Sequence, residues 1–266
     1  MRGKIGSIMV ILLLGLTLSS AGQEKCKAEF NVNADVVSRY VWRGTQYGGD
    51  FPSVQPTLSV KMPNFTFGVW GSYSLSGSSV TQELDLFALY TFKDEMFTIG
   101  LTDYFFPNAS VDYSYLDYGA NSTGHVLEGS FTYNGVEKFP LSVMLAVNFF
   151  GADAARLDND PSSVNFNSKT GIQYSNYLEF NYPWKVKDID IKATAGITLS
   201  SPREFDASTA YIGESGYYAS KAGVVNLGVK VAKELKLTEE FSLPLSGSFI
   251  VNPITKKVFY VISISF

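Results

Sequence analysis

Apolar and polar residues alternate over most of the chain, and the alternation continues to its last residue. At the C-terminus, one set of alternate positions is wholly apolar and consists of Val258, Tyr260, Ile262, Ile264 and Phe266. The positions between them include Ser263 and Ser265. Because successive side chains of a strand point to opposite faces, this pattern predicts a strand with one apolar face.

The same period recurs in eleven earlier segments, each bounded by turn residues. The twelve expected strands are Phe30–Arg43, Ser53–Met62, Phe65–Leu75, Gln82–Phe92, Met96–Phe105, Val126–Tyr133, Leu141–Phe149, Tyr174–Tyr182, Ile189–Leu199, Val225–Val231, Phe241–Val251 and Val258–Phe266. An even number of alternating strands predicts an all-β fold, a transmembrane antiparallel up-and-down β-barrel of about twelve strands.

Short and longer connections alternate between these segments. Short turns are expected near Pro63, Asp94, Asn134, Pro183 and Lys236. Longer connections fall at 44–52, 76–81, 106–124, 151–171, 200–222 and 252–257. Outer-membrane barrels have short periplasmic turns and longer extracellular loops. A soluble β-sandwich, the alternative fold, has no reason to sort its connections by length.

Aromatic residues concentrate towards the strand ends, which predicts two girdles at the lipid–water interfaces. The turn-side girdle would contain Phe65, Phe67, Tyr90, Phe92, Phe97, Tyr133, Tyr182, Phe241 and Phe266. The loop-side girdle would contain Tyr40, Trp42, Tyr73, Phe105, Phe149, Phe249 and Tyr260.

The N-terminus has the layout of a secretory signal peptide. Arg2 and Lys4 precede an apolar run from Ile8 to Leu18, and small residues follow. The run is too short to span a bilayer, so we expect a cleaved signal peptide at 1–22 and a barrel domain at 23–266. Cys26 is the only cysteine, which excludes an internal disulfide.

Composition excludes nucleic acid as a partner and fits a barrel in lipid. The formal net charge is −4, whereas nucleic-acid-binding domains are basic. Charged residues make up 17% of the chain, below the roughly 25% usual in soluble domains. Aromatic residues make up 15%.

The apolar C-terminal strand predicts where the protein is assembled. A terminal Phe266 below Tyr260, Ile262 and Ile264 resembles the assembly signal of bacterial outer-membrane barrels. We therefore expect a Gram-negative outer-membrane protein. Its expected partners are outer-membrane lipid, lipopolysaccharide, and the barrel-assembly machinery, which would bind the C-terminal strand.

If the apolar faces meet lipid, the opposite faces line the lumen. The charged candidates for the lumen or a constriction are Asp35, Arg39, Arg43, Lys61, Glu83, Asp85, Glu128, Glu179, Asp190, Lys192 and Lys230. Opposed charges across a narrow pore could select ions, or they could pair as structural salt bridges. Glu83 and Asp85 would favour cations or neutralise a nearby base.

Two other functional classes remain open. Some outer-membrane barrels are lipid hydrolases that use histidine and serine, but the only histidine, His125, has outward parity near the loop-side rim. A non-conducting structural or partner-binding barrel would need large loops. Segment 106–124 carries several tyrosines and would lie on the surface or narrow the pore. We expect no catalytic residues, no metal site and no cofactor.

Several early stretches resemble the TorF family of porins. They are Ala34–Gln46 (ADVVSRYVWRGTQ), Pro52–Pro56 (PSVQP), Phe67–Ser72 (FGVWGS) and Glu83–Leu86 (ELDL). The resemblance implies an outer-membrane barrel with a channel role and supplies no catalytic residues. We expect a monomeric, non-enzymatic channel for the passive diffusion of small polar solutes or ions.

Overall fold

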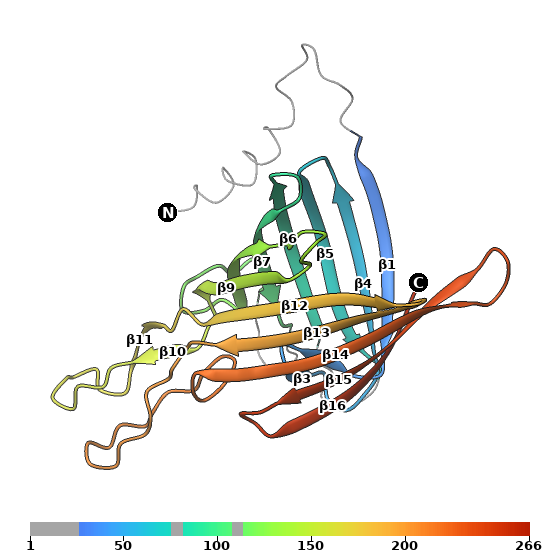
Figure 1. Ribbon diagram of the computed structural model, residues 1–266. Coiled ribbons are helices and arrows are strands. Elements are labelled where there is room, and N and C mark those ends of the chain that lie inside the picture. Colours follow the sequence, from blue (N-terminus) through green and yellow to red (C-terminus); the bar gives the residue numbers. More distant parts are fainter. Residues whose placement is uncertain (1–26, 76–81, 108–113) are drawn as a thin grey trace, which may run out of the picture.

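The barrel is closed. The structure is a computed structural model that describes residues 27–75, 82–107 and 114–266 (Figure 1). In these ranges, twelve antiparallel strands pair in the order β1-β16-β15-β14-β13-β12-β9-β8-β7-β6-β5-β4, and β4 pairs again with β1. The predicted fold class and strand number are therefore confirmed. The expected signal peptide, 1–22, and Cys26 lie outside the described residues.

The barrel strands follow the predicted segments closely. Their bounds are β1 Glu29–Val37, β4 Ser53–Lys61, β5 Phe65–Ser74, β6 Gln82–Phe92, β7 Phe97–Phe105, β8 His125–Tyr133, β9 Ser142–Gly151, β12 Asn176–Val186, β13 Ile189–Thr198, β14 Gly223–Lys236, β15 Ser242–Asn252 and β16 Lys257–Ser265. The described residues contain no helix that is long and apolar enough to cross a membrane.

Three predicted details of the strands are wrong. β14 runs from Gly223 to Lys236 rather than from Val225 to Val231. The first strand ends at Val37 rather than Arg43, and the chain then turns into the lumen. Pro183 lies within β12 rather than in a turn. Its pairing with β9 ends at Asn181, so Pro183 sits where β12 has no neighbour on that side, and a missing N–H costs no ladder bond there.

Side chains sort by face as the alternation predicts. Phe30 and Val32 on the outer face of β1 are 75% and 80% exposed. Near the turn-side ends of β5 to β8, outward rings form a continuous band. Phe65 lies 4.7 Å from Tyr90 between ring centroids, and Phe97 lies 5.7 Å from Tyr133. An exposed apolar belt of this extent is expected of a surface that contacts lipid.

The loop-side girdle is only partly as predicted. Tyr40 and Trp42 lie in the lumen instead of facing outward, because the chain leaves the barrel wall after Val37. Phe105 is buried beneath the connection that follows it. Phe249 and Tyr260 remain on the outer face, with ring centroids 5.2 Å apart.

Two long connections project from the loop side and pack on each other (Figure 1). The first contains the hairpin of β10 (Ala155–Leu157) and β11 (Lys169–Ile172), and the second is 199–222. The carboxylate of Glu214 in the second connection accepts a hydrogen bond from Arg156 at 2.6 Å and from the Leu157 N–H at 3.0 Å. Most of these two connections extends beyond the barrel, but Tyr218 of the second one reaches Glu128 of β8 and Trp42.

Candidate functional site

A short hairpin between β1 and β4 enters the loop side of the lumen. It consists of β2 (Tyr40–Trp42) and β3 (Thr45–Tyr47). Its two turn residues, Arg43 and Gly44, both have positive φ, 49° and 77°. That conformation is typical of the two-residue turns that join tightly twisted antiparallel strands. We call residues 40–47 the lumenal hairpin.

The guanidinium of Arg43 is the polar centre of the site. It donates two hydrogen bonds to the carboxylate of Glu128 on β8, one of them 2.9 Å long. It also donates to the Tyr218 hydroxyl at 2.6 Å. The hydroxyl of Tyr104 donates to Glu128 at 2.9 Å. An ion pair so nearly buried is stable only when its remaining hydrogen-bonding capacity is used, as it is here.

Aromatic rings surround the same guanidinium. Its central carbon lies 4.3 Å from the Trp42 ring centroid and 4.6 Å from that of Tyr177 on β12. Cations over aromatic faces are stabilised by the ring quadrupole, most strongly where water is excluded. On the other side of the hairpin, Tyr40 packs 5.5 Å from Trp70 of β5, between ring centroids.

The tip of the lumenal hairpin touches the far wall. A Cβ on Gly44 would lie 1.9 Å from the carbonyl oxygen of Val225 on β14, so only glycine fits there. The side-chain amide of Asn252, at the end of β15, donates to the Gly44 carbonyl at 3.1 Å. Since β8 lies nearly opposite β1 in the barrel order, the hairpin and the Arg43 side chain together cross the lumen.

Two buried carboxylates lie on β6, on the inner wall next to the lumenal hairpin. Glu83 is 2% exposed and Asp85 is 6% exposed, and both have inward parity. Oε2 of Glu83 and Oδ1 of Asp85 have no hydrogen-bond partner among the described residues. Neither forms an ion pair with Arg39, Arg43 or Lys61 within the described chain, because Arg43 is taken by Glu128 and Arg39 lies 3.4 Å from Asp50.

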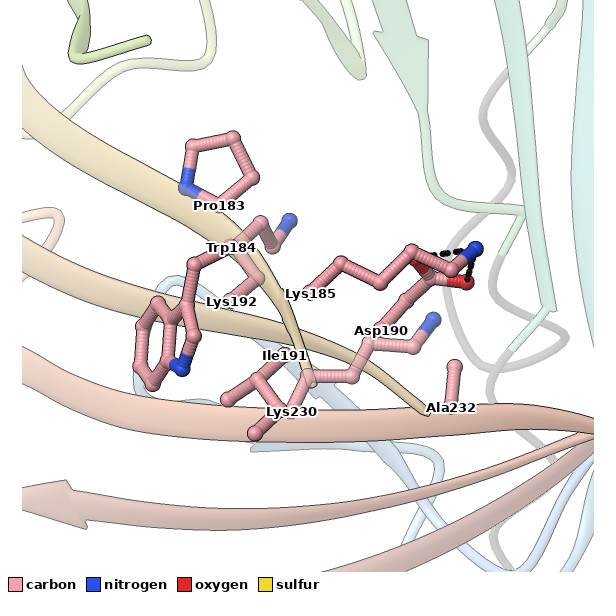
Figure 2. Close-up of a pocket in the computed structure, with 8 residues that line it drawn as sticks. All are labelled: Pro183, Trp184, Lys185, Asp190, Ile191, Lys192, Lys230 and Ala232. Carbon is pink, nitrogen blue, oxygen red and sulfur yellow. Dashed lines mark hydrogen bonds and ion pairs between the residues drawn. The ribbon is translucent and has the colours of Figure 1, made fainter. Parts of the chain in front are cut away.

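The turn-side half of the lumen has the opposite character. Lys192 on β13 and Lys230 on β14 are register partners with inward parity, and both are exposed to the lumen. They border a cavity of about 490 Å³ that Pro183, Lys185, Asp190 and Ala232 also line (Figure 2). Figure 2 shows Lys185 joined to Asp190, whereas neither Lys192 nor Lys230 reaches a carboxylate there.

The remaining predicted lumen residues are spread over the wall. Asp35 accepts a hydrogen bond from Ser265 at 2.5 Å, across the seam between β1 and β16. Glu179 accepts from Tyr177 and Asn181. Lys61 is exposed at the turn-side end of β4. The structure thus brings together Arg43 with Glu128, Glu83 with Asp85, and Lys192 with Lys230, but not the whole set.

The C-terminal residues that resemble an assembly signal all have outward parity. Tyr260 is 70% exposed, and Ile262, Ile264 and Phe266 continue the same face of β16. Phe266 exchanges backbone hydrogen bonds with Ala34 of β1. The terminal residue therefore takes part in barrel closure.

An outward-facing pair near the loop-side rim was not predicted. Nδ1 of His125 lies 2.8 Å from Asp103 Oδ1, and Nε2 lies 2.7 Å from the carbonyl oxygen of Tyr115. Tyr118 stacks on the imidazole, with centroids 4.2 Å apart. The described part of 106–124 therefore lies over the outer wall here. Both ring nitrogens of His125 therefore have partners among the described residues.

Comparisons with known proteins give a family and an architecture. Residues 21–214 match the model of a family described as a bacterial protein of unknown function, Gcw_chp. That description does not carry the TorF name, so the TorF resemblance stays a prediction. No curated protein sequence matches the chain.

Solved structures of similar architecture share very little sequence with the chain. The KdgM porin is 10% identical with a TM-score of 0.45, over 88% of this chain and 97% of that one. An outer membrane channel from Pseudomonas putida F1 is 12% identical with a TM-score of 0.40, over 93% of this chain and 98% of that one. Similarity of this degree does not identify a function.

Proposed function

Since the chain belongs to the Gcw_chp family of bacterial proteins of unknown function, we propose its function from the barrel itself: an outer-membrane channel for the passive diffusion of small polar solutes. The loop side would be extracellular and the turn side periplasmic. The bilayer would surround the outer face, with lipopolysaccharide at the loop-side rim. The barrel-assembly machinery would recognise the strand that ends at Phe266.

One observation carries this proposal, namely the opposite chemistry of the two faces of the barrel wall. Large apolar side chains such as Phe30 and Val32 are exposed on the outside, whereas exposed lysines such as Lys192 and Lys230 face inward. A water-filled lumen stabilises unpaired ammonium groups, which a dry, side-chain-filled barrel of eight strands would not.

The lumenal hairpin makes the channel narrow. It crosses the lumen near the loop side and is held there by the Arg43–Glu128 ion pair and by Asn252. Passage at the loop side is therefore limited to what the hairpin leaves free. We expect small single-channel steps compared with those of open barrels of sixteen or more strands.

Single-channel conductance in a planar bilayer under a salt gradient tests the proposal. Refolded mature protein should produce discrete current steps, and the reversal potential should report the net selectivity. A correctly folded barrel, verified by circular dichroism, that passes no current in any variant would contradict the channel function. A non-conducting structural barrel would then be the better description.

A further inference from the structure

Two neighbouring lysines on the turn-side lumen wall have no counter-ion among the described residues. Lys192 and Lys230 are direct register partners on β13 and β14. Like charges directly opposite on neighbouring strands repel each other. Neither lysine forms an ion pair with a described residue, although Lys185 nearby lies 3.1 Å from Asp190. Asp190, the nearby acid, thus pairs with Lys185, and no described carboxylate neutralises the ammonium groups of Lys192 and Lys230.

The space around these lysines suits a small solute. Lys192 and Lys230 line both the cavity of about 490 Å³ and a second cavity of about 140 Å³. The second cavity adds the polar side chains of Thr194, Asn226 and Ser248. Small-molecule sites commonly have several hundred cubic ångströms and a few convergent polar groups.

We infer that Lys192 and Lys230 form a binding site for small organic anions that carry carboxylates, on the turn-side wall of the lumen. An anion between the two ammonium groups offsets their mutual repulsion, and the flexible lysine stems allow solutes of different shape. The inference rests on the proposed function, because a lumenal site serves passage only if the barrel conducts. It also names the preferred solute class.

Calorimetric titration of detergent-refolded protein with succinate tests the site without any need for current. Wild type should bind succinate, and the double variant Lys192→Gln/Lys230→Gln should bind about tenfold more weakly, as expected for two lost exposed ion pairs. Lys233→Gln is the matched control. It removes one lysine charge from β14, the strand of Lys230, but Lys233 has the opposite parity and pairs with Asp188 at 2.8 Å.

The outcomes separate the two proposals. Equal succinate affinity in wild type and the double variant, or no binding by wild type, would overturn the anion site. Succinate binding that depends on both lysines, in a barrel that conducts no current, would preserve the site and refute the channel. If current flows, the double variant should also shift the reversal potential towards cation selectivity.

A different observation, at the seam of the barrel, carries a second inference. The ladder between β1 and β16 runs from Asp35 to Val37 and then stops. At Ser38 one backbone bond remains, from its N–H to the Ile262 carbonyl, while the Ile262 N–H donates to the Ser38 hydroxyl instead of a carbonyl. The regular pairing therefore fails where the lumenal hairpin leaves the wall.

Beyond Ser38, the edge of β16 has no backbone partner in the part of the chain that the structure describes. Continued register would place Tyr40 opposite Tyr260 and Trp42 opposite Val258. Because hydrogen-bonded pairs alternate along a ladder, the backbone groups of Tyr260 and Val258 face this seam. No described residue pairs with them on that side. An unpaired strand edge is costly in a bilayer, which offers no water to satisfy it.

The sequence of this segment suits a completed strand as well as a hairpin. Tyr40 and Trp42 have the parity of the outward Val36, and they would join the exposed Tyr260 at the interface. We propose that residues 38–43 exchange between two positions: the lumenal hairpin, and an extension of β1 that pairs with β16. The extended position removes the obstruction from the lumen, so this segment is a gate.

Fluorescence quenching by lipids with brominated acyl chains tests the gate through Trp42. The variant Trp70→Phe/Trp184→Phe retains Trp42 as its only tryptophan. In the structure Trp42 packs on Tyr104 in the lumen, so quenching should be weak. Adding Glu128→Gln removes the partner of Arg43 and should raise Trp42 quenching several-fold. The control Trp42→Phe/Trp70→Phe retains only the outward-facing Trp184, which should be strongly quenched throughout.

Two results would overturn the gate. The first is weak Trp42 quenching that Glu128→Gln leaves unchanged while Trp184 is strongly quenched, because the segment then never reaches lipid. The second is a rise in Trp42 quenching without protection of the Tyr260 and Val258 amides from hydrogen exchange. The segment would then have left the lumen without pairing with β16.

Discussion

The two halves of the lumen differ in how their charges are satisfied. On the loop side, Arg43 and Glu128 are buried, paired and hydrogen-bonded to tyrosines. On the turn side, Lys192 and Lys230 are exposed and unpaired among the described residues. A charge in contact with water tolerates the lack of a partner, whereas a buried one does not. The loop side therefore holds the lumenal hairpin in place, whereas we propose that the turn side binds solute.

Removal of the lumenal hairpin should abolish this difference most completely. Replacement of Tyr40–Tyr47 by a short Gly-Ser linker deletes the segment that crosses the lumen. We expect the single-channel conductance to increase several-fold, because the loop-side half becomes as open as the turn side. Deletion of 158–167, the tip of the β10–β11 hairpin, is the control. An unchanged conductance after hairpin removal would show that it does not limit passage.

A substitution at Gly44 should displace the hairpin without deleting it. Gly44→Ala puts a Cβ against the Val225 carbonyl at a residue with φ of 77°. We expect larger conductance steps than in wild type, by about twofold. Gly49→Ala is a close control, because its φ is 76° but its Cβ would meet only the Phe51 ring at 3.4 Å. Equal conductance steps in both variants would mean that backbone strain, rather than contact with β14, displaces the tip of the hairpin.

Loss of one partner of the buried ion pair should be the next largest effect. Glu128→Gln leaves the Arg43 guanidinium without a countercharge, which typically destabilises a buried pair by about 3–5 kcal/mol. Urea unfolding in lipid vesicles measures this against Lys192→Gln, whose charge is exposed and unpaired. Similar losses of stability in the two variants would show that the buried ion pair contributes no more to stability than an exposed, unpaired charge.

Much of this fold could be predicted because strand parity is a local property of the sequence. Alternation alone assigns Phe30 and Val32 outward and Lys192 and Lys230 inward. It cannot show that the chain leaves the wall after Val37, since Tyr40 and Trp42 keep the same alternation. The signal was the dipeptide Arg43-Gly44 between two short aromatic stretches, a sequence compatible with a tight turn.

The composition of the site was less predictable than the fold. Arg43, Glu128 and Tyr218 lie far apart in sequence, and their meeting depends on a hairpin that reaches across the lumen. His125 and Asp103 also meet through register between β7 and β8, and a covering loop hides them from solvent. Contacts of this kind depend on tertiary arrangement, which periodicity does not encode.

The contribution of the acidic pair on β6 to ion selectivity should depend on the lumenal hairpin. Glu83 and Asp85 are buried behind the obstruction, so Glu83→Ala/Asp85→Ala should barely change the reversal potential of wild type. In the protein without Tyr40–Tyr47, the same substitutions should reduce cation preference, since both carboxylates then face the open lumen. Bilayer recordings of the four proteins form a double-mutant cycle. Equal shifts with and without the hairpin would place both acids in the conducting path already.

The smallest expected effect concerns Glu214, whose side chain is buried between the two long connections outside the barrel. Burial acts to raise the pKa of Glu214, but the N–H groups of Arg203 and Leu157 and the charge of Arg156 outweigh it and lower the pKa below its ordinary 4.5. The ionised carboxylate therefore stabilises loop docking fully above about pH 4.5, and this contribution is lost as pH falls through the lowered pKa. NMR shifts of the Leu157 and Arg203 amides should report the transition. Glu214→Gln, which cannot titrate, should remove it, whereas a transition that persists in this variant would assign the loss to another group.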